Sequence, residues 1–292
     1  MNQALRYFAL AALALVVAGC GASGSSVPSA SYVQQGTQGT AQVSGSPSGP
    51  QWVQVPGYGT DIGVGPNNAA WTLAAQYPCC YGNYEVASYS ASTQAWTLVS
   101  GAYASRIAVA PDTGMPWLAT DDGRIFEYNG SAFVQIPGYA ADIGVGPNSI
   151  AWVLARQYPD GKGNYEVAYY SPSSKTWSLV NGAYGARIAV SPDTGTPWLV
   201  TAAHLIYKWN GSSFVLMPGH GADIAVGPNG IGWTLGTDYP DKKGNYQVFQ
   251  WSPGTGTWIA NTGFAVNIAV SPTGTPWVVN AAGGIFEYVG AN

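Results

Sequence analysis

Charged residues are scarce in this sequence. Asp, Glu, Lys and Arg make up only 8% of its 292 residues, and the formal net charge is −4. Proteins that bind nucleic acid carry a basic face that neutralises phosphates. We therefore expect no nucleic-acid partner.

Residues that commonly carry catalysis are also few. The two histidines, His204 and His220, have no partner at the spacing of a known motif. No Gly-x-Ser-x-Gly elbow, clustered metal-binding histidines or phosphate-binding loop is present. Carboxylates such as Asp112 and Asp193 recur with the repeat described below. We expect a protein that is not an enzyme and that needs no cofactor or metal.

Cysteine occurs only three times. Cys79 and Cys80 are adjacent and lack the further Cys or His ligands that a metal site needs. In an oxidising compartment they could form a strained vicinal disulfide, bridge two molecules or stay free.

An uncharged apolar run occurs only near the start of the chain, from Tyr7 to Val17. It is too short to span a bilayer and is typical of a signal peptide, here residues 1–19. Val17-Ala18-Gly19-Cys20 resembles a bacterial lipobox, which implies lipidation of Cys20. The alternative is an ordinary cleavage site beside a small residue.

Residues 20–50 carry no charge and are rich in Ser, Gly and Gln. Such a segment buries too little apolar surface to fold, so we expect a disordered tether. The folded part, 51–292, would then be lipid-anchored to the bacterial cell envelope, at the outer membrane. The lipid would be its only membrane contact.

What the sequence does contain is an internal repeat. Trp52-Val-Gln-Val-Pro-Gly returns at Phe133 and at Phe214, each time after 81 residues (133 − 52 and 214 − 133). Each 81-residue unit divides into a long and a short half with the same order of apolar runs and turns. The chain therefore contains six repeats, and a strict period of this kind fixes the architecture.

Each repeat predicts four short strands. The first is Ile-(Gly/Ala)-Val, whose small central residue suits an innermost strand; the others begin or end on an aromatic residue. With 39 Gly, 20 Pro and 13% aromatics, the composition favours many strands joined by tight turns. We predict an all-β, six-bladed β-propeller with pseudo-threefold symmetry, closed by pairing of the N-terminal strand with the C-terminal strand.

The order Trp/Phe-x-x-Val/Ile-x-Gly, Ile-x-Val-Gly, Trp-x-Leu/Val and Ile-Phe/Tyr-x-Tyr is similar to the tectonin β-propeller repeat, found in tectonins, tachylectin-1 and fish-egg lectin. The resemblance covers residues 52–290. It implies binding of carbohydrate or lipopolysaccharide. The chain departs from the pattern in its long hairpins, such as Tyr77 to Tyr84, and in small residues where an aliphatic one is expected: Gly59, Ala140 and Gly221.

One aromatic or His side chain per repeat precedes the innermost strand, in what we predict to be a loop. Three tyrosines of the long hairpins would share its face of the propeller. The nine candidates are Tyr58, Tyr103, Tyr139, Tyr184, His220, Phe264, Tyr77, Tyr158 and Tyr239. Their rings could stack on a sugar, or they could only cap the core.

A polar residue directly precedes each innermost strand. In ring order these residues are Asp61, Arg106, Asp142, Arg187, Asp223 and Asn267. Alternating charges there favour a structural ring of ion pairs at the mouth of the channel. Asn267 would leave Asp223 or Asp61 less well neutralised. A ring that holds a cation or polar ligand is the alternative.

Three functions remain open. The first is a membrane-tethered lectin-like module for glycan or lipopolysaccharide, which gains avidity from repeated sites. The second is a scaffold that binds an envelope protein, and the third is a propeller lyase or hydrolase. We expect a monomer and favour the lectin-like module.

Overall fold

The computed structural model describes residues 31–32 and 50–290. The described residues form β-strands joined by tight turns, with four single-turn 3-10 helices at Pro66–Asn68, Cys80–Gly82, Pro147–Ser149 and Pro228–Gly230. Within this part of the chain, no helix has the length and apolar character needed to cross a membrane. The predicted signal peptide and Cys20 lie outside the described residues.

The strands form three curled antiparallel sheets, each with seven strands in the ring. The first sheet contains, in spatial order, β5 (Ala95–Ala104), β4 (Tyr84–Ser90), β3 (Ala70–Pro78), β2 (Gln51–Val64), β22 (Gly284–Val289), β21 (Pro276–Val279) and β20 (Asn267–Val270). The second contains β12 (Thr176–Gly185), β11 (Tyr165–Ser171), β10 (Ala151–Pro159), β9 (Phe133–Val145), β8 (Arg124–Tyr128), β7 (Pro116–Ala119) and β6 (Arg106–Val109). The third contains β13 (Arg187–Val190), β14 (Pro197–Val200), β15 (Leu205–Trp209), β16 (Phe214–Val226), β17 (Gly232–Pro240), β18 (Tyr246–Ser252) and β19 (Thr257–Ala265).

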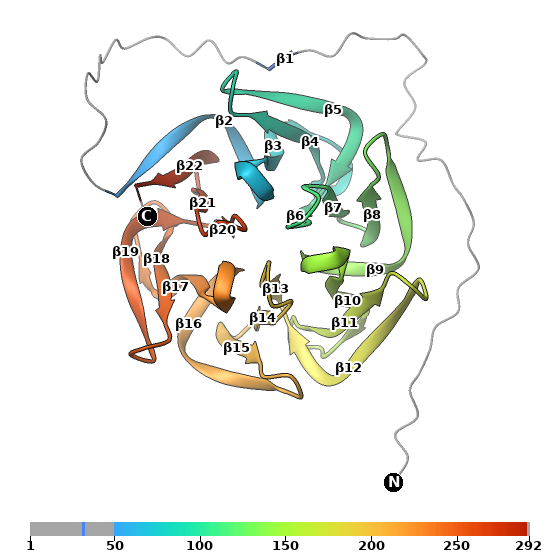
Figure 1. Cartoon of the computed structure of the whole chain (residues 1–292), viewed down its shortest axis with the longest axis vertical. Helices are drawn as coiled ribbons and strands as arrows, with labels where there is room; N and C mark the ends of the chain where they lie inside the picture. The colour runs from blue at the N-terminus through green and yellow to red at the C-terminus, as the bar shows by residue number, and fades with distance from the viewer. Residues whose placement is uncertain (1–30, 33–49, 291–292) are drawn as a thin grey trace.

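The sheets surround a central axis (Figure 1), which makes the fold propeller-like. Strands β6, β13 and β20 and the inner ends of β2, β9 and β16 lie closest to that axis. These strands converge so closely that a Cβ on Gly63 would lie 2.8 Å from Val109 Cγ2. The sequence predicts a small residue at the centre of each of these strands, and the close approach of the neighbouring strand explains why.

The middle strand of each sheet is shared by both of its halves. In β9, Phe133 to Tyr139 pair with β8, whereas Ala140 to Val145 pair with β10. The strand bends at Gly138, whose φ is +118° and whose Cβ would lie 2.9 Å from Trp177 Nε1. Glycine is required there both by the positive φ and by the contact with the indole.

This continuity corrects one prediction. The candidate ligand residues do not lie in loops, because the backbone stays paired on both sides of each bend. Strands β2, β9 and β16 carry Tyr58, Tyr139 and His220. Strands β5, β12 and β19 carry Tyr103, Tyr184 and Phe264, and strands β3, β10 and β17 carry Tyr77, Tyr158 and Tyr239.

The ring closes between the two ends of the described core, as the sequence predicts. Strand β2 pairs with β22 from Gln51 opposite Val289 onward. Trp52 and Tyr288 face each other there, with ring centroids 5.0 Å apart. This pairing leaves no unpaired edge between the first and last strands of the ring.

The segment predicted to be a tether is described only at Ser31–Tyr32 and residue 50. Ser31 and Tyr32 form the short strand β1, which pairs with β5 opposite Thr97 and Trp96. At these two residues the chain is thus paired with the first sheet rather than extended away from it.

Candidate functional site

A cavity of about 380 Å³ lies in the second sheet, where β9 passes from one half of the sheet to the other. Tyr139, Tyr158 and Trp177 provide aromatic rings at its wall, and Gln157 and Lys175 provide polar groups. The remaining lining residues are Ile125, Pro137, Gly138, Val153, Ala155, Ala168, Thr176 and Leu179. The cavity is therefore an apolar pocket with a few polar groups, which is the usual chemistry of a small-molecule site.

The strand geometry explains how these side chains meet. Val153 and Ala155 are two residues apart on β10, so both project from the same face of the sheet. Gln157 and Tyr158 follow in the irregular part of the strand, where the pairing with β11 shifts. Trp177 is held from β12, because its indole N–H donates a 2.5 Å hydrogen bond to the Pro137 carbonyl. The Pro-Gly bend thus both redirects β9 and fixes one aromatic wall of the cavity.

The corresponding place in the third sheet is filled. Phe249 occupies the repeat position of Ala168 and packs on Tyr239, with ring centroids 5.2 Å apart. Gly236 makes room for it, since a Cβ there would lie 2.7 Å from the Phe249 ring. The repeat therefore brings the same backbone to this place in different sheets but not the same pocket.

The nine aromatic and His candidates are distributed over all three sheets. Tyr139 and Tyr158 come together in the cavity. His220 lies instead beside Asp238, with 3.1 Å between Nδ1 and Oδ2. Tyr103 on β5 lies across from Glu85, and Tyr184 on β12 lies across from Glu166.

Sequence reasoning missed Trp177 and Lys175 as parts of a pocket. Trp177 was visible only as the first aromatic residue of a strand. Lys175 takes a positive φ of 56°, in a turn where the other units have Gln94 and Gly256. A residue-by-residue comparison of the three units could have found Lys175, whereas Trp177 is a Trp in every unit (Trp96 and Trp258) and gives no such signal.

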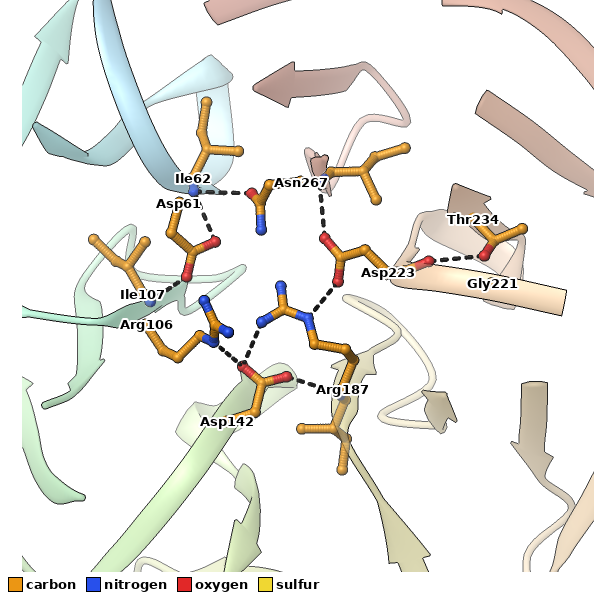
Figure 2. A network of polar contacts seen from close by, with 12 residues as sticks. Asp61, Ile62, Arg106, Ile107, Asp142, Arg187, Gly221, Asp223, Thr234 and Asn267 are labelled. Carbon is orange, nitrogen blue, oxygen red and sulfur yellow. Dashed lines mark hydrogen bonds and ion pairs between the residues drawn. The ribbon is translucent and has the colours of Figure 1, made fainter. Parts of the chain in front are cut away.

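The six polar residues that precede the innermost strands do form a ring around the channel (Figure 2). Arg187 pairs with Asp223 through Nε at 2.7 Å and with Asp142 at 3.5 Å. Arg106 pairs with Asp142 at 3.6 Å. Beneath the ring, the Ile-x-Val strands line a narrow channel space of about 90 Å³.

The aspartates also tie neighbouring innermost strands together. Each accepts a hydrogen bond from the backbone N–H of an isoleucine on the next strand of the ring. The donors are Ile107 to Asp61 at 3.0 Å, Ile188 to Asp142 at 2.8 Å and Ile268 to Asp223 at 3.0 Å. These bonds satisfy buried carboxylate oxygens and explain why Asp recurs at this position.

Asp61 is the acid that the ring leaves without a close cation. Within the described residues, no Lys or Arg nitrogen lies at ion-pair distance from it. Its side chain is buried, and this loss of hydration raises its pKa to about 6, although Arg106 and Arg187 act in the opposite direction. Burial likewise raises the pKa of Asp142, against the attraction of Arg187 and Arg106. Asn267 stands where the repeat would place a third arginine. Asp61 is therefore the acid that lacks an ion-pair partner among the residues that the structure describes.

The Sγ atoms of Cys79 and Cys80 lie 3.1 Å apart. This is contact distance and is well beyond the length of a disulfide bond, about 2.05 Å. The two sulfurs are thus in contact without a disulfide bond between them, and a vicinal disulfide under oxidising conditions stays a prediction. No group of three or more His, Cys, Asp or Glu side chains suited to a metal occurs among residues 31–32 and 50–290.

Comparison with protein-family models gives no match, and comparison with curated protein sequences gives none either. Solved structures do match. A protein of unknown function from Bacteroides thetaiotaomicron aligns with a TM-score of 0.59 and 12% identity over 82% of this chain and 76% of its own. A gluconolactonase from Xanthomonas campestris aligns with a TM-score of 0.57 and 10% identity over 82% and 89%. A chain of the mitotic checkpoint complex aligns with a TM-score of 0.51 and 8% identity over 89% and 100%.

The shared feature is the fold. These neighbours support a propeller-like architecture, whereas identities of 8–12% carry no activity from one chain to another.

Proposed function

We propose that this chain is a non-catalytic, lectin-like binding module whose principal site is the cavity lined by Tyr139, Tyr158 and Trp177. The cavity is the observation that supports this proposal. Its volume of about 380 Å³ falls within the range of about 300–1,000 Å³ that is usual for small-ligand pockets.

The chemistry of the lining suits a sugar. Aromatic faces pack against the C–H groups of a pyranose ring, and polar groups at the edge orient its hydroxyls. Here Tyr139 is 44% exposed, so its ring is available at the entrance. Gln157 and Lys175 supply a carboxamide and an ammonium group beside the rings.

A glycan array that includes lipopolysaccharides and O-methylated sugars tests this proposal. We expect saturable binding, competed by free sugar and weakened at least tenfold by Tyr139→Ala. Tyr81→Ala is the matched control, because Tyr81 is 84% exposed and does not line the cavity. Equal loss in both variants would mean that the cavity is not the site.

A blank array with well-folded protein would favour the second candidate, a scaffold for an envelope protein. Exposed apolar side chains near the start of β9 and β16 support that candidate: Val134 at 47%, Val215 at 46% and Leu216 at 56% exposure. The gluconolactonase neighbour is the observation that favours an enzyme, and it concerns the fold alone.

We also infer that each sheet comprises two four-stranded blades that share its long strand, which gives six blades and an approximate threefold repeat. The pairing of β9 with both β8 and β10 supports this division. The tectonin-like pattern, lipidation at Cys20 and an outer-membrane location belong to the same proposal. Labelling of cells with a radioactive fatty acid, compared with Cys20→Ala, tests the anchor.

A further inference from the structure

The charged ring lacks one cation. Its three aspartates alternate with only two arginines, because Asn267 occupies the third arginine position. Each arginine reaches the next aspartate in the ring, Arg106 to Asp142 and Arg187 to Asp223. By the same geometry, an arginine at position 267 would reach Asp61.

Asn267 supplies hydrogen-bonding groups at this position but not the positive charge that an arginine would bring. Its Oδ1 accepts a 3.1 Å hydrogen bond from the Ile62 N–H, so the amide ties the first and last innermost strands. Its side chain is buried, at 4% exposure, and its Nδ2 has no hydrogen-bond acceptor among the described residues. Figure 2 shows this Nδ2 directed toward the centre of the ring.

Space is available at this position. The channel, of about 90 Å³ in all, is lined at its polar end by Asp61, Asp142, Arg187, Asp223 and Asn267. A water molecule takes about 30 Å³ of liquid volume, so an ion with bound water fits there. The surrounding charges are Asp61, Asp142 and Asp223 against Arg106 and Arg187, which leaves one negative charge when all three acids are ionised.

We propose that the mouth of the channel binds one small monovalent cation, Na⁺, K⁺ or ammonium, between Asp61 and Asp223 at the place of the missing arginine. Carboxylate oxygens are suitable ligands for such hard cations. A water on the ion accepts the hydrogen bond that Asn267 Nδ2 offers. The cation neutralises the buried charge that the protein itself leaves unpaired.

The proton is the competitor of this cation. Burial shifts Asp61 toward its protonated form near neutral pH, and a protonated Asp61 no longer attracts a cation. The ion is therefore expected to bind more tightly at pH 8 than at pH 5.

Thermal unfolding of the full chain in different chloride salts tests the site. Ionic strength is held constant with choline chloride, whose cation is too large for the channel, and Na⁺, K⁺ or ammonium replaces choline stepwise at pH 8. At ten times its dissociation constant, an ion that fits should raise the midpoint by about 3–5 °C. At pH 5 the rise should be much smaller.

Asn267→Arg is the decisive variant, since it supplies the missing cation and should abolish the ion-specific rise. Gln135→Arg adds the same charge at an exposed position outside the ring and should leave the rise intact. If Asn267→Arg does not fold, Asp61→Asn serves instead and should also abolish the rise. Equal midpoints in all four salts, or a rise that persists in Asn267→Arg or Asp61→Asn, would overturn the proposal.

Discussion

Thr72 fills the space that a side chain at Gly59 would need. A Cβ on Gly59 would lie 2.2 Å from Thr72 Oγ1, and that hydroxyl donates a 2.7 Å hydrogen bond to the backbone carbonyl of Asp61. The third unit has the same pair, Thr234 with Gly221, at 2.3 Å. The second unit changes both partners together, to Val153 and Ala140. The small residue after the bend is therefore set by its neighbour on the next strand.

This relationship predicts a coupled effect on stability. Gly59→Ala should lower the free energy of unfolding by about 1–3 kcal/mol, because the added methyl group overlaps the threonine hydroxyl. Thr72→Val alone should also destabilise, since it removes a buried hydrogen bond. The double variant reproduces the second unit, so its cost should be smaller than the sum. Denaturant unfolding of the four proteins measures this coupling, and strict additivity would contradict it.

Filling the cavity with the side chain that the third unit has at the same place should block the proposed ligand site. In the third unit Phe249 occupies the position of Ala168, and Gly236 provides the room. We expect Ala155→Gly with Ala168→Phe to retain the fold and to lose at least tenfold in glycan affinity. Affinity is measured by calorimetry with a sugar selected on the array.

Two controls accompany that variant. Ala155→Gly alone enlarges the cavity and should keep binding. Ala87→Phe with Ala74→Gly makes the corresponding change in the first unit and should have little effect on affinity. Binding that survives in the filled cavity would place the site elsewhere.

The sequence predicted the features that every unit shares. The Ile-x-Val strands, the ring of charged residues and the pairing of Trp52 with the last strand all follow from positions that recur. The cavity was not predictable in this way, because it depends on differences between units, such as Ala168 against Phe249. The loops expected around Tyr139 were wrong for a related reason. A Pro-Gly pair usually indicates a turn, whereas here Trp177 packs against it and the strand continues.

The raised pKa of Asp61 predicts how stability depends on pH. An acid that holds its proton to about pH 6 in the folded state, but only to about 3.8 when unfolded, binds more protons when folded between these values. Stability from this group is therefore present at low pH and is lost as the pH rises from about 4 through 6. The full change is on the order of 3 kcal/mol.

Denaturant unfolding between pH 4 and pH 8 measures this dependence. Asp61→Asn should flatten it, whereas Asp112→Asn, at an exposed position, should not. Stability is compared as a slope against pH, because Asp61→Asn also alters the hydrogen bond from Ile107. A slope unchanged by Asp61→Asn would assign the proton uptake to another group, such as Asp142.

Residues taken from the other two long hairpins should stabilise the tip of the first one. At the position of Cys79, the second unit has Asp160, whose Oδ1 accepts hydrogen bonds from the backbone N–H groups of Lys162 at 2.7 Å and Asn164 at 3.0 Å. A thiol cannot replace a carboxylate in these bonds, and Asn83 donates instead to the Cys80 carbonyl. Cys79→Asp with Cys80→Gly should therefore raise the free energy of unfolding under reducing conditions. Cys79→Ala with Cys80→Gly removes the same thiols without adding the acceptor and should give no such gain. An equal gain in both would mean that loss of the cysteines, rather than the new hydrogen bonds, is responsible.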